Sequence, residues 1–260
     1  MPDSTMLGPR IIAVANQKGG VGKTTTTINL GASLATLGKR VLLIDLDPQG
    51  NASTGLGVAR DARARSTYDL LLGDEPADRL ARETETPNLW IIPSTMDLSS
   101  ADIDLVANEK RSFLLQDALR GQRDFDYVLI DCPPSLSILT VNAMVAAHGI
   151  IVPLQSEFFA LEGLSQLMLT LRDVRRTANP NLAIDGVLLT MHDARNRLAK
   201  QVEADARETL GDLVFDTVVP RNVRLSEAPS YALSALDYDP NSAGSRAYME
   251  LANELLNRLS

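Results

Sequence analysis

The chain has little of several features that would place it in a specialised class of protein. Its single cysteine, Cys132, excludes an intrachain disulfide and a cysteine-rich metal site within one chain. Aromatic residues make up only 4% of the 260 residues, and no apolar run approaches the roughly 20 residues that a transmembrane helix needs. Residues 1–10 carry no hydrophobic signal segment, so a flexible N-terminal tail and a cytoplasmic location are expected. The net charge of −8 argues against general affinity for nucleic acid but permits a local basic patch.

What the chain does contain is an alternation of short apolar runs with helical patterns. This alternation predicts an α/β fold with a mostly parallel, twisted sheet that helices cover on both faces. The expected strands are 11–15, 41–44, 89–92, 127–130, 150–152, 184–189 and 213–219. The expected helices are 24–37, 112–119, 138–147, 161–177, 197–210 and 245–259. The polar stretch 57–86 is interpreted as an excursion rather than a second domain, so residues 1–260 are expected to form a single domain.

A glycine-rich loop follows the first predicted strand and opens the first predicted helix. Its residues are Lys18, Gly19, Gly20, Val21, Gly22, Lys23, Thr24 and Thr25. The second half fits the phosphate-binding pattern G-x-x-x-x-G-K-[ST], in which backbone N–H groups and a helix N-terminus cradle phosphates. We therefore predict a nucleotide site in which Lys23 contacts the β- and γ-phosphates and the Thr24 hydroxyl binds Mg²⁺. The alternative is a plain glycine turn between a strand and a helix.

The loop departs from that pattern at its beginning. Gln17 stands where the first glycine is expected, and a second lysine, Lys18, lies five residues before Lys23. The loop amides and one lysine already neutralise a triphosphate bound in the same subunit. The most economical task for Lys18 is therefore to reach a nucleotide held by a partner subunit.

Three aspartates follow predicted strands and are expected at the edge of the sheet that carries the loop. Asp131 ends the strand 127–130 and is predicted to organise Mg²⁺ through a metal-bound water. Asp45 and Asp47 follow the strand 41–44, and strand alternation would place both carboxylates on one side. Asp47 is predicted to orient the attacking water, while Asp45 is open to the same role or to a supporting role below the site. Cys132 is interpreted as a small buried residue rather than a redox group.

Taken together, these segments resemble the ParA/Soj chromosome-partitioning ATPases, which belong to the deviant Walker A group that also includes MinD. The resemblance rests on the loop 18–25 and on four further segments, 45–51 (DLDPQGN), 131–136 (DCPPSL), 158–163 (FFALEG) and 220–229 (PRNVRLSEAP). The matching segments follow the family's order from Lys18 to Pro229, so the resemblance covers nearly the whole chain.

The resemblance implies a Mg²⁺-dependent ATPase that is monomeric without ATP and forms a nucleotide sandwich dimer with it. In such a dimer the lysine matching Lys18 contacts the partner's phosphates, and the aspartate matching Asp47 positions water. The segment around Pro220 and Asn222 lies against the adenine. The homodimer would bind double-stranded DNA without sequence preference. A ParB-type centromere-binding protein would then stimulate hydrolysis and release the ATPase from the nucleoid.

The basic residues expected to contact DNA lie near the end of the chain. They are Arg195, Arg197, Lys200 and Arg224. By composition alone, the six basic and five acidic residues in 194–224 favour a solvated helix face. The resemblance changes that interpretation, because the positions matching Arg195 and Arg224 are ones that the family uses for DNA.

Three other functions fit parts of the pattern. A MinD-like membrane-cycling ATPase remains the alternative, but it needs a basic amphipathic C-terminal helix, and residues 248–260 carry two acids and one arginine. No membrane partner is therefore expected. An iron–sulfur reductase of the shared-cluster kind needs two cysteines per subunit, whereas this chain has one. A tyrosine autokinase would be expected to carry a C-terminal tyrosine cluster, but Tyr231, Tyr238 and Tyr248 are scattered.

Overall fold

The computed structural model describes residues 8–73, 75–101, 108–157 and 160–260. They form an eight-stranded sheet with the strand order β3-β4-β2-β5-β1-β6-β7-β8. The strands are β1 (Arg10–Val14), β2 (Val41–Asp45), β3 (Arg82–Glu83), β4 (Leu89–Ile92), β5 (Tyr127–Asp131), β6 (Gly149–Gln155), β7 (Ala183–His192) and β8 (Val214–Pro220). Only β3 pairs antiparallel with its neighbour among these strands, and the other pairs are parallel. The predicted fold class is confirmed.

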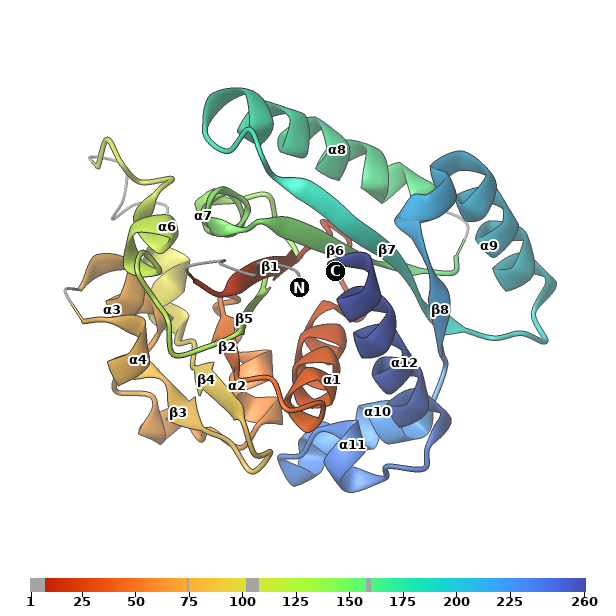
Figure 1. Cartoon of the computed structure of the whole chain (residues 1–260), viewed down its shortest axis with the longest axis horizontal. Helices are drawn as coiled ribbons and strands as arrows, with labels where there is room; N and C mark the ends of the chain where they lie inside the picture. The colour runs from red at the N-terminus through yellow and green to blue at the C-terminus, as the bar shows by residue number, and fades with distance from the viewer. Residues whose placement is uncertain (1–7, 74, 102–107, 158–159) are drawn as a thin grey trace.

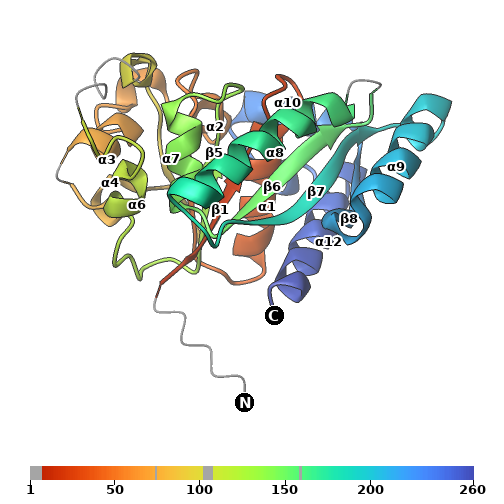
Figure 2. The same cartoon turned by 90° about the horizontal axis from the view of Figure 1, so that it is seen from above.

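Helices cover both faces of this sheet (Figure 1). They are α1 (Lys23–Thr36), α2 (Asn51–Gly55), α3 (Thr67–Leu72), α4 (Ala77–Leu80), α6 (Leu114–Ala118), α7 (Ile138–Ala146), α8 (Ala160–Thr177), α9 (Arg197–Leu210), α10 (Val223–Glu227), α11 (Ala235–Tyr238) and α12 (Ala243–Arg258). In Figure 1, α7 and α8 lie above the sheet, and α1 and α12 lie below it. Figure 2 shows α8 running across β6 and β7, with α12 on the far side of the sheet.

Successive residues of the strands pack on opposite faces of the sheet and belong to two separate hydrophobic cores. Ile12, Leu43 and Ile151 belong to the core that also contains apolar residues of α1 and α12. Their neighbours Ile44 and Ile150 belong to the core under α7 and α8. Because parallel strands covered on both faces must be apolar throughout, their sequences are continuous apolar runs rather than alternating ones.

The C-terminal helix α12 is part of the core. Tyr248 is fully buried there, and its hydroxyl oxygen lies 3.1 Å from Thr26 Oγ1 on α1, the helix that follows the glycine-rich loop. Leu251 and Leu255 are also fully buried. The apolar face of α12 is therefore already covered by the protein itself. Within the described ranges, no helix has the length and apolar character needed to cross a bilayer.

The structure differs from the sequence-based expectations at several places. The stretch 57–86 contains α3, α4 and β3, so it extends the sheet by one short strand. The predicted tail ends earlier than residue 10, because Pro9 is buried and Arg10 begins β1; residues 1–7 lie outside the described part. The short helices α2, α10 and α11 were not expected, since four or five residues are too few to show a repeating apolar pattern.

The strand order decides what surrounds the loop. Strand β1 lies between β5 and β6, and Val14 is in register with Asp131. Asp45 at the end of β2 is in register with Asp131 from the other side. The carboxyl ends of β1, β2 and β5 therefore meet at one edge of the sheet, which is where parallel α/β sheets bind their ligands.

Candidate functional site

The glycine-rich loop joins β1 to α1 at this edge. Gly20 and Gly22 have φ angles of +74° and +89°, in the left-handed region that residues with a Cβ atom rarely adopt. Gly22 precedes α1, and within the described residues no side chain caps the first N–H groups of that helix. These N–H groups are unsatisfied by the helix itself, so the loop presents them to an anion.

Lys23 is folded into the loop. Its side chain belongs to a residue that is only 7% exposed, and Nζ donates a hydrogen bond of 3.0 Å to the carbonyl oxygen of Lys18. Burial lowers the pKa of Lys23, and the nearby carboxyl groups of Asp131 and Asp47 oppose this shift. The ammonium group is thus held in place by a neutral acceptor, and a phosphate oxygen is a stronger acceptor of the same hydrogen bond.

Lys18 is held by its backbone and by one partly exposed ion pair of its side chain. Its N–H donates to Asn16 Oδ1 at 3.0 Å, and Asn16 Nδ2 in turn donates to the carbonyl oxygen of Pro153 on β6 at 2.7 Å. The ammonium group lies 3.3 Å from Glu157 Oε2, and the Lys18 side chain is 35% exposed. The Lys18 ammonium group is therefore partly exposed and paired with a carboxylate after β6, whereas the Lys23 ammonium group is bound within the loop.

Asp131 provides an unsatisfied oxygen beside the loop. It is fully buried, its Oδ1 accepts a hydrogen bond from Thr27 Oγ1 at 3.3 Å, and its Oδ2 has no partner within the described part of the chain. Burial raises the pKa of Asp131 well above the ordinary value; the Asp45 carboxyl adds to the shift, and the nearby Thr24 hydroxyl opposes it. A buried carboxylate with an open oxygen next to a threonine hydroxyl suits a hard cation such as Mg²⁺.

The described residues contain no cluster of three or more His, Cys, Asp or Glu side chains that could hold a metal ion. An ion at Thr24 and Asp131 would need further oxygens from elsewhere. Mg²⁺ is commonly bound by one or two protein oxygens together with water and substrate phosphates. The residues present therefore fit Mg²⁺ that arrives with a nucleotide.

The two aspartates after β2 occupy different places. The strand ends at Asp45, so Asp47 lies in the turn that follows, and the expected strand alternation does not extend to it. Asp45 is fully buried, and its Oδ2 accepts hydrogen bonds from Ser53 N at 2.8 Å and Ser53 Oγ at 2.6 Å. Burial raises the pKa of Asp45 to about 6, although the Ser53 bonds oppose the shift. Asp45 thus holds α2 in place, which favours the supporting role that the sequence left open.

Asp47 is 7% exposed, and its Oδ1 accepts a hydrogen bond from Gln49 N at 3.0 Å. Its backbone carbonyl accepts from Ser94 Oγ at 2.6 Å. The turn is therefore held by one hydrogen bond to the Asp47 side chain and one to the Asp47 backbone. The role of Asp47 in orienting water stays a prediction, and its nearness to Lys23 is consistent with that role.

Two residues that hold the loop were missed from the sequence. Thr190 on β7 donates its hydroxyl to the carbonyl oxygen of Val21 at 2.8 Å, and Asn16 holds Lys18 as described above. The next residue, Met191, has a φ of +50°, which is unusual for a side chain of its size. A polar residue at the end of an apolar strand was the available signal for Thr190, but the predicted strand stopped at residue 189.

A hollow lies beside α1, and residues of α1, α2 and the segment after α10 line it. Its volume is about 340 Å³, and Thr24, Thr25, Thr54 and Pro229 are among its lining residues. Pro220 and Asn222 do not line it. Pro220 ends β8, and Asn222 caps α10 by accepting a hydrogen bond from Arg224 N at 2.9 Å. Their expected contact with adenine stays a prediction.

The predicted DNA-contacting residues are all on the surface, but they are not equivalent. Arg195 is paired with Asp193 at 3.1 Å, and Arg224 is paired with Glu227 at 2.7 Å and Asp239 at 3.3 Å. Arg197 and Lys200 are exposed at the start of α9, and neither has an ion pair within the described residues. The two arginines that the family resemblance singled out are therefore the two already paired with acids.

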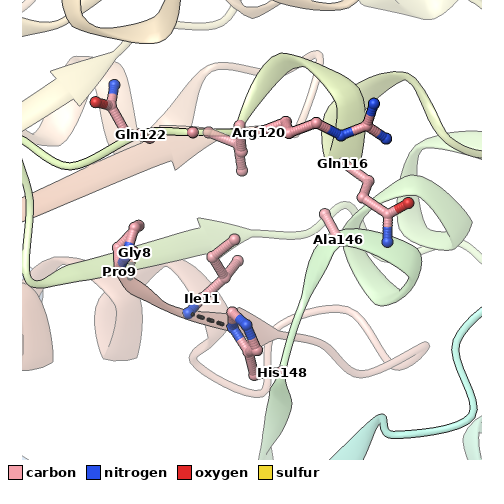
Figure 3. A pocket seen from close by; sticks show the side chains of 10 residues that line it. Gly8, Pro9, Ile11, Gln116, Arg120, Gln122, Ala146 and His148 are labelled. Atoms are coloured by element: carbon pink, nitrogen blue, oxygen red, sulfur yellow. Dashed lines mark hydrogen bonds between the residues drawn. The ribbon is translucent and has the colours of Figure 1, made fainter. Parts of the chain in front are cut away.

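A second hollow lies at the opposite edge of the sheet, near the start of β1 (Figure 3). Its volume is about 380 Å³, but most of its polar side chains have partners. His148 Nδ1 accepts from Ile11 N at 3.0 Å, Gln116 donates to the Val145 carbonyl at 3.1 Å, and Arg120 pairs with Asp117 at 2.6 Å. We assign no site there.

Cys132 lies between Asp131 and the double proline and is fully buried, at 1% exposure. Burial raises the pKa of the Cys132 thiol, and the neighbouring Asp131 carboxyl adds to the shift. A thiol that stays protonated is a poor nucleophile and a poor metal ligand. The structure supports the interpretation of Cys132 as a small buried residue.

The chain is similar to known proteins over most of its length. A family model described as an AAA domain matches residues 9–184. The chain is 57% identical over 252 residues to the chromosome partitioning protein ParA of Caulobacter vibrioides (strain NA1000 / CB15N), covering 96% of this chain and 94% of that protein. It is 51% identical over 250 residues to the chromosome-partitioning ATPase Soj of Thermus thermophilus, covering 96% of each.

Among solved structures, the chain is similar to cobyrinic acid a,c-diamide synthase from Mycobacterium smegmatis with bound ATP analog and magnesium. The TM-score is 0.84, the sequence identity is 38%, and 96% of each chain is covered. The two relatives and this solved structure each match nearly the full length of the chain, well beyond the glycine-rich loop.

Proposed function

The chain belongs to the ParA/Soj family of chromosome-partitioning ATPases, and from this premise we propose that it couples ATP hydrolysis to cycles of DNA binding and release. It is an ATPase that uses ATP with Mg²⁺. In the proposed cycle, ATP joins two copies into a sandwich dimer that binds double-stranded DNA without sequence preference. A ParB-type centromere-binding protein stimulates hydrolysis and releases the dimer. The cycle would take place in the cytoplasm, on the nucleoid, with residues 1–260 acting as one ATPase domain.

The position of Lys18 carries this proposal. Its backbone is held by Asn16 and Lys23, while its ammonium group lies at the surface beside Glu157. A partly exposed lysine whose side-chain partner within the described residues is an exposed carboxylate can exchange that partner for a nucleotide in a second subunit. A positive charge supplied from outside during phosphoryl transfer can raise turnover by about 10³–10⁵-fold, as arginine fingers do. Hydrolysis would then depend on dimerisation.

Within one subunit, the proposed roles follow from the contacts in the loop. The backbone N–H groups of residues 19–25 bind phosphate oxygens, and Lys23 exchanges the Lys18 carbonyl for the β- and γ-phosphates. Thr24 and Asp131 would hold Mg²⁺, which supplies charge neutralisation at the phosphate oxygens. Asp47 orients the attacking water from its anchored turn.

The remaining predicted residues are assigned to adenine and DNA. Pro220 and Asn222 contact the base; the Oδ1 of Asn222 is taken by the cap of α10, so its side-chain amide group is the donor left for adenine. Arg195, Arg197, Lys200 and Arg224 contact DNA phosphates. Non-specific contacts of this kind have dissociation constants of about 10⁻⁴–10⁻⁶ M at physiological salt, weak enough for repeated release.

The test is ATP turnover measured alone, with double-stranded DNA, and with DNA plus the cognate ParB-type protein. We expect slow basal turnover and clear stimulation when both partners are present. Lys18→Ala should keep ATP binding but lose the stimulated turnover by one or more orders of magnitude. Lys39→Ala, which removes a lysine beyond the far end of α1, is the matched control and should be stimulated normally. Normal stimulation of Lys18→Ala would overturn the role in the partner's site.

A further inference from the structure

One arginine in the segment after α2 is buried, although arginine is seldom fully buried in proteins. Arg63 is only 5% exposed, and it follows the 3₁₀ helix Arg60–Ala62 in the stretch that was interpreted as an excursion. Burial lowers the pKa of its guanidinium group, and the carboxyl group of Asp45 opposes this shift. The group stays charged, because arginine does not lose its proton in proteins. A buried charge of this kind requires hydrogen-bond acceptors around it.

Three neutral oxygens bind the guanidinium group of Arg63. Its Nε and one terminal nitrogen donate to the carbonyl oxygen of Val58 at 3.1 and 2.7 Å. The same terminal nitrogen donates to Thr54 Oγ1 at 2.8 Å, and the other one donates to the carbonyl oxygen of Ser94 at 3.1 Å. Thr54 lies in α2, Val58 follows α2, and Ser94 follows β4. Arg63 thus connects α2 to the end of a strand of the sheet.

Ser94 extends this connection to the turn that contains Asp47. The Ser94 hydroxyl donates to the backbone carbonyl oxygen of Asp47 at 2.6 Å, and the Ser94 N–H donates to Ser53 Oγ at 2.9 Å. Ser53 in turn donates to the buried carboxylate of Asp45. Ser94 therefore accepts a hydrogen bond from Arg63 and also holds the residue that is proposed to orient water.

A glycine leaves the space that the Arg63 guanidinium group occupies. Gly50 lies between Asp47 and α2 and has a φ of +64°, a conformation that glycine adopts without steric cost. A Cβ atom at this position would lie 2.2 Å from a terminal nitrogen of Arg63 and 3.2 Å from the carbonyl oxygen of Ser94. A side chain at position 50 would therefore displace the guanidinium group from its hydrogen bonds.

The segment that Arg63 holds reaches from Asp47 to the hollow beside α1. Thr54 both lines that hollow, together with Thr24, and accepts a hydrogen bond from Arg63. We propose that Arg63 is a positioning residue for ATP hydrolysis, which fixes residues 47–58 so that the Asp47 carboxylate meets the attacking water. The inference rests on the proposed function, because Asp47 is taken as the residue that orients water.

The loss of Arg63 should affect the rate of hydrolysis more than the binding of nucleotide. Its side-chain hydrogen bonds within the described residues go to Thr54, Val58 and Ser94, and none of these belongs to the glycine-rich loop. Phosphate binding at the loop should therefore persist without the arginine. A displacement of about 1 Å in a positioning group can lower a rate by about 10²-fold.

The experiment measures single-turnover hydrolysis of ATP with Mg²⁺ by the full-length protein, and its affinity for a non-hydrolysable ATP analogue. Arg63→Ala should lower the rate by about 10²-fold and leave the affinity nearly unchanged. Guanidinium chloride, far below the concentration that unfolds the wild type, should restore part of the rate, whereas sodium chloride at the same ionic strength should not. Such a rescue distinguishes a missing donor group from a damaged fold.

Two further variants test the geometry of the contact. Arg63→Lys keeps the charge but offers one ammonium group in place of the planar fork, so its rate should also fall. Gly50→Ala keeps the arginine but displaces it, so its rate should fall and guanidinium should not restore it. The matched control is Arg65→Ala, which removes an exposed arginine paired with Glu75 and should keep the wild-type rate.

Thermal melting verifies that each variant is folded, and Arg63→Lys carries the test if Arg63→Ala does not fold. Wild-type rates of the Arg63 variants beside a slow Asp47→Ala overturn the positioning role alone. Joint loss of rate and analogue affinity in Arg63→Ala, without rescue by guanidinium, overturns it too, because the arginine would then only stabilise the fold. A wild-type rate of Asp47→Ala instead overturns the catalytic assignment on which the inference rests.

Discussion

The phosphate loop and the basic hollow, which Arg195, Arg221 and Arg246 line beyond β7 and β8, both lie at the carboxyl ends of strands, but they hold their charges in opposite ways. Around the loop, Asp45 and Asp131 are fully buried and Lys23 is 7% exposed. At the hollow, the side chain of Arg195 is 92% exposed and its partner is an aspartate two residues away. The loop's charges are bound to backbone and hydroxyl groups from several elements. In the hollow, Arg195 is bound to a local acid and Arg246 to a backbone carbonyl oxygen.

Buried and exposed charged groups differ in how firmly they hold their partners. A buried polar group that loses its partner costs about 1–3 kcal/mol, and more when it is charged, so the groups around the loop hold one geometry firmly. An exposed ion pair contributes only about 0–1 kcal/mol, so Arg195 can exchange Asp193 for another anion at little cost. Fixed geometry suits the chemistry of phosphoryl transfer, and easy exchange suits reversible attachment to DNA.

The largest effect on activity is expected from a substitution among the buried residues around the glycine-rich loop. Asp47→Ala should lower single-turnover hydrolysis by about 10²–10⁴-fold, because the attacking water loses its orienting group. Binding of an ATP analogue should persist, and the protein should accumulate as an ATP-bound dimer on DNA. Asp61→Ala is a control, because Asp61 is an exposed aspartate in the neighbouring segment. Wild-type turnover of Asp47→Ala would move the catalytic role elsewhere.

A second prediction concerns stability at the same buried site. The pKa of Asp45 is about 6 in the folded protein against an ordinary 3.8, so the folded state binds more protons than the unfolded state between these values. The contribution of Asp45 to the free energy of unfolding is therefore complete below about pH 4 and is lost as pH rises through 6. Its size is on the order of 2–3 kcal/mol.

Asp45→Asn removes this titration, so urea unfolding measured from pH 5 to 7 should show a shallower loss of stability than in the wild type. Asp97→Asn, at an exposed position, should leave the wild-type slope unchanged. Parallel pH profiles for Asp45→Asn and the wild type would show that Asp45 does not titrate in this range.

A smaller effect on stability is expected when an exposed arginine is replaced. Arg224→Gln breaks two exposed ion pairs, yet the free energy of unfolding should change by less than about 1 kcal/mol. DNA binding in the ATP state should weaken, with a salt slope flatter by about 0.9 for each phosphate that Arg224 neutralises in the wild type. Calorimetry and anisotropy on the same sample separate the two effects. A large drop in melting temperature would show that the exposed pairs are structural after all.

The smallest effect is expected for Arg120→Ala. This arginine pairs with Asp117 at the opposite edge of the sheet, where both side chains are substantially exposed. Stability should change by at most about 0.5 kcal/mol, and ATP turnover and DNA binding should equal those of the wild type. Any loss of DNA binding would mean that the contact surface is wider than the hollow and its neighbours.

The sequence predicted the sheet and the phosphate loop because both leave local signals. Buried parallel strands are continuous apolar runs, and the loop is a short motif of fixed spacing. Contacts that depend on strand order left no such signal. Thr190 reaches Val21 only because β1, β6 and β7 are neighbours in the sheet. Arg246 joins Arg221 only because α12 returns to pack beside β8.

The short span Thr190–Met191–His192 contacts two separate parts of the molecule. At one end Thr190 holds the carbonyl oxygen of Val21 at 2.8 Å, and at the other the carbonyl oxygen of His192 holds the N–H of Arg221 at 3.0 Å. Met191 between them has a positive φ of +50°, which is uncommon for a residue with a long side chain, so its contacts must hold it in that conformation. Three consecutive residues at the end of β7 thus contact both the glycine-rich loop and the segment that follows β8, so a substitution there would disturb two parts of the molecule at once.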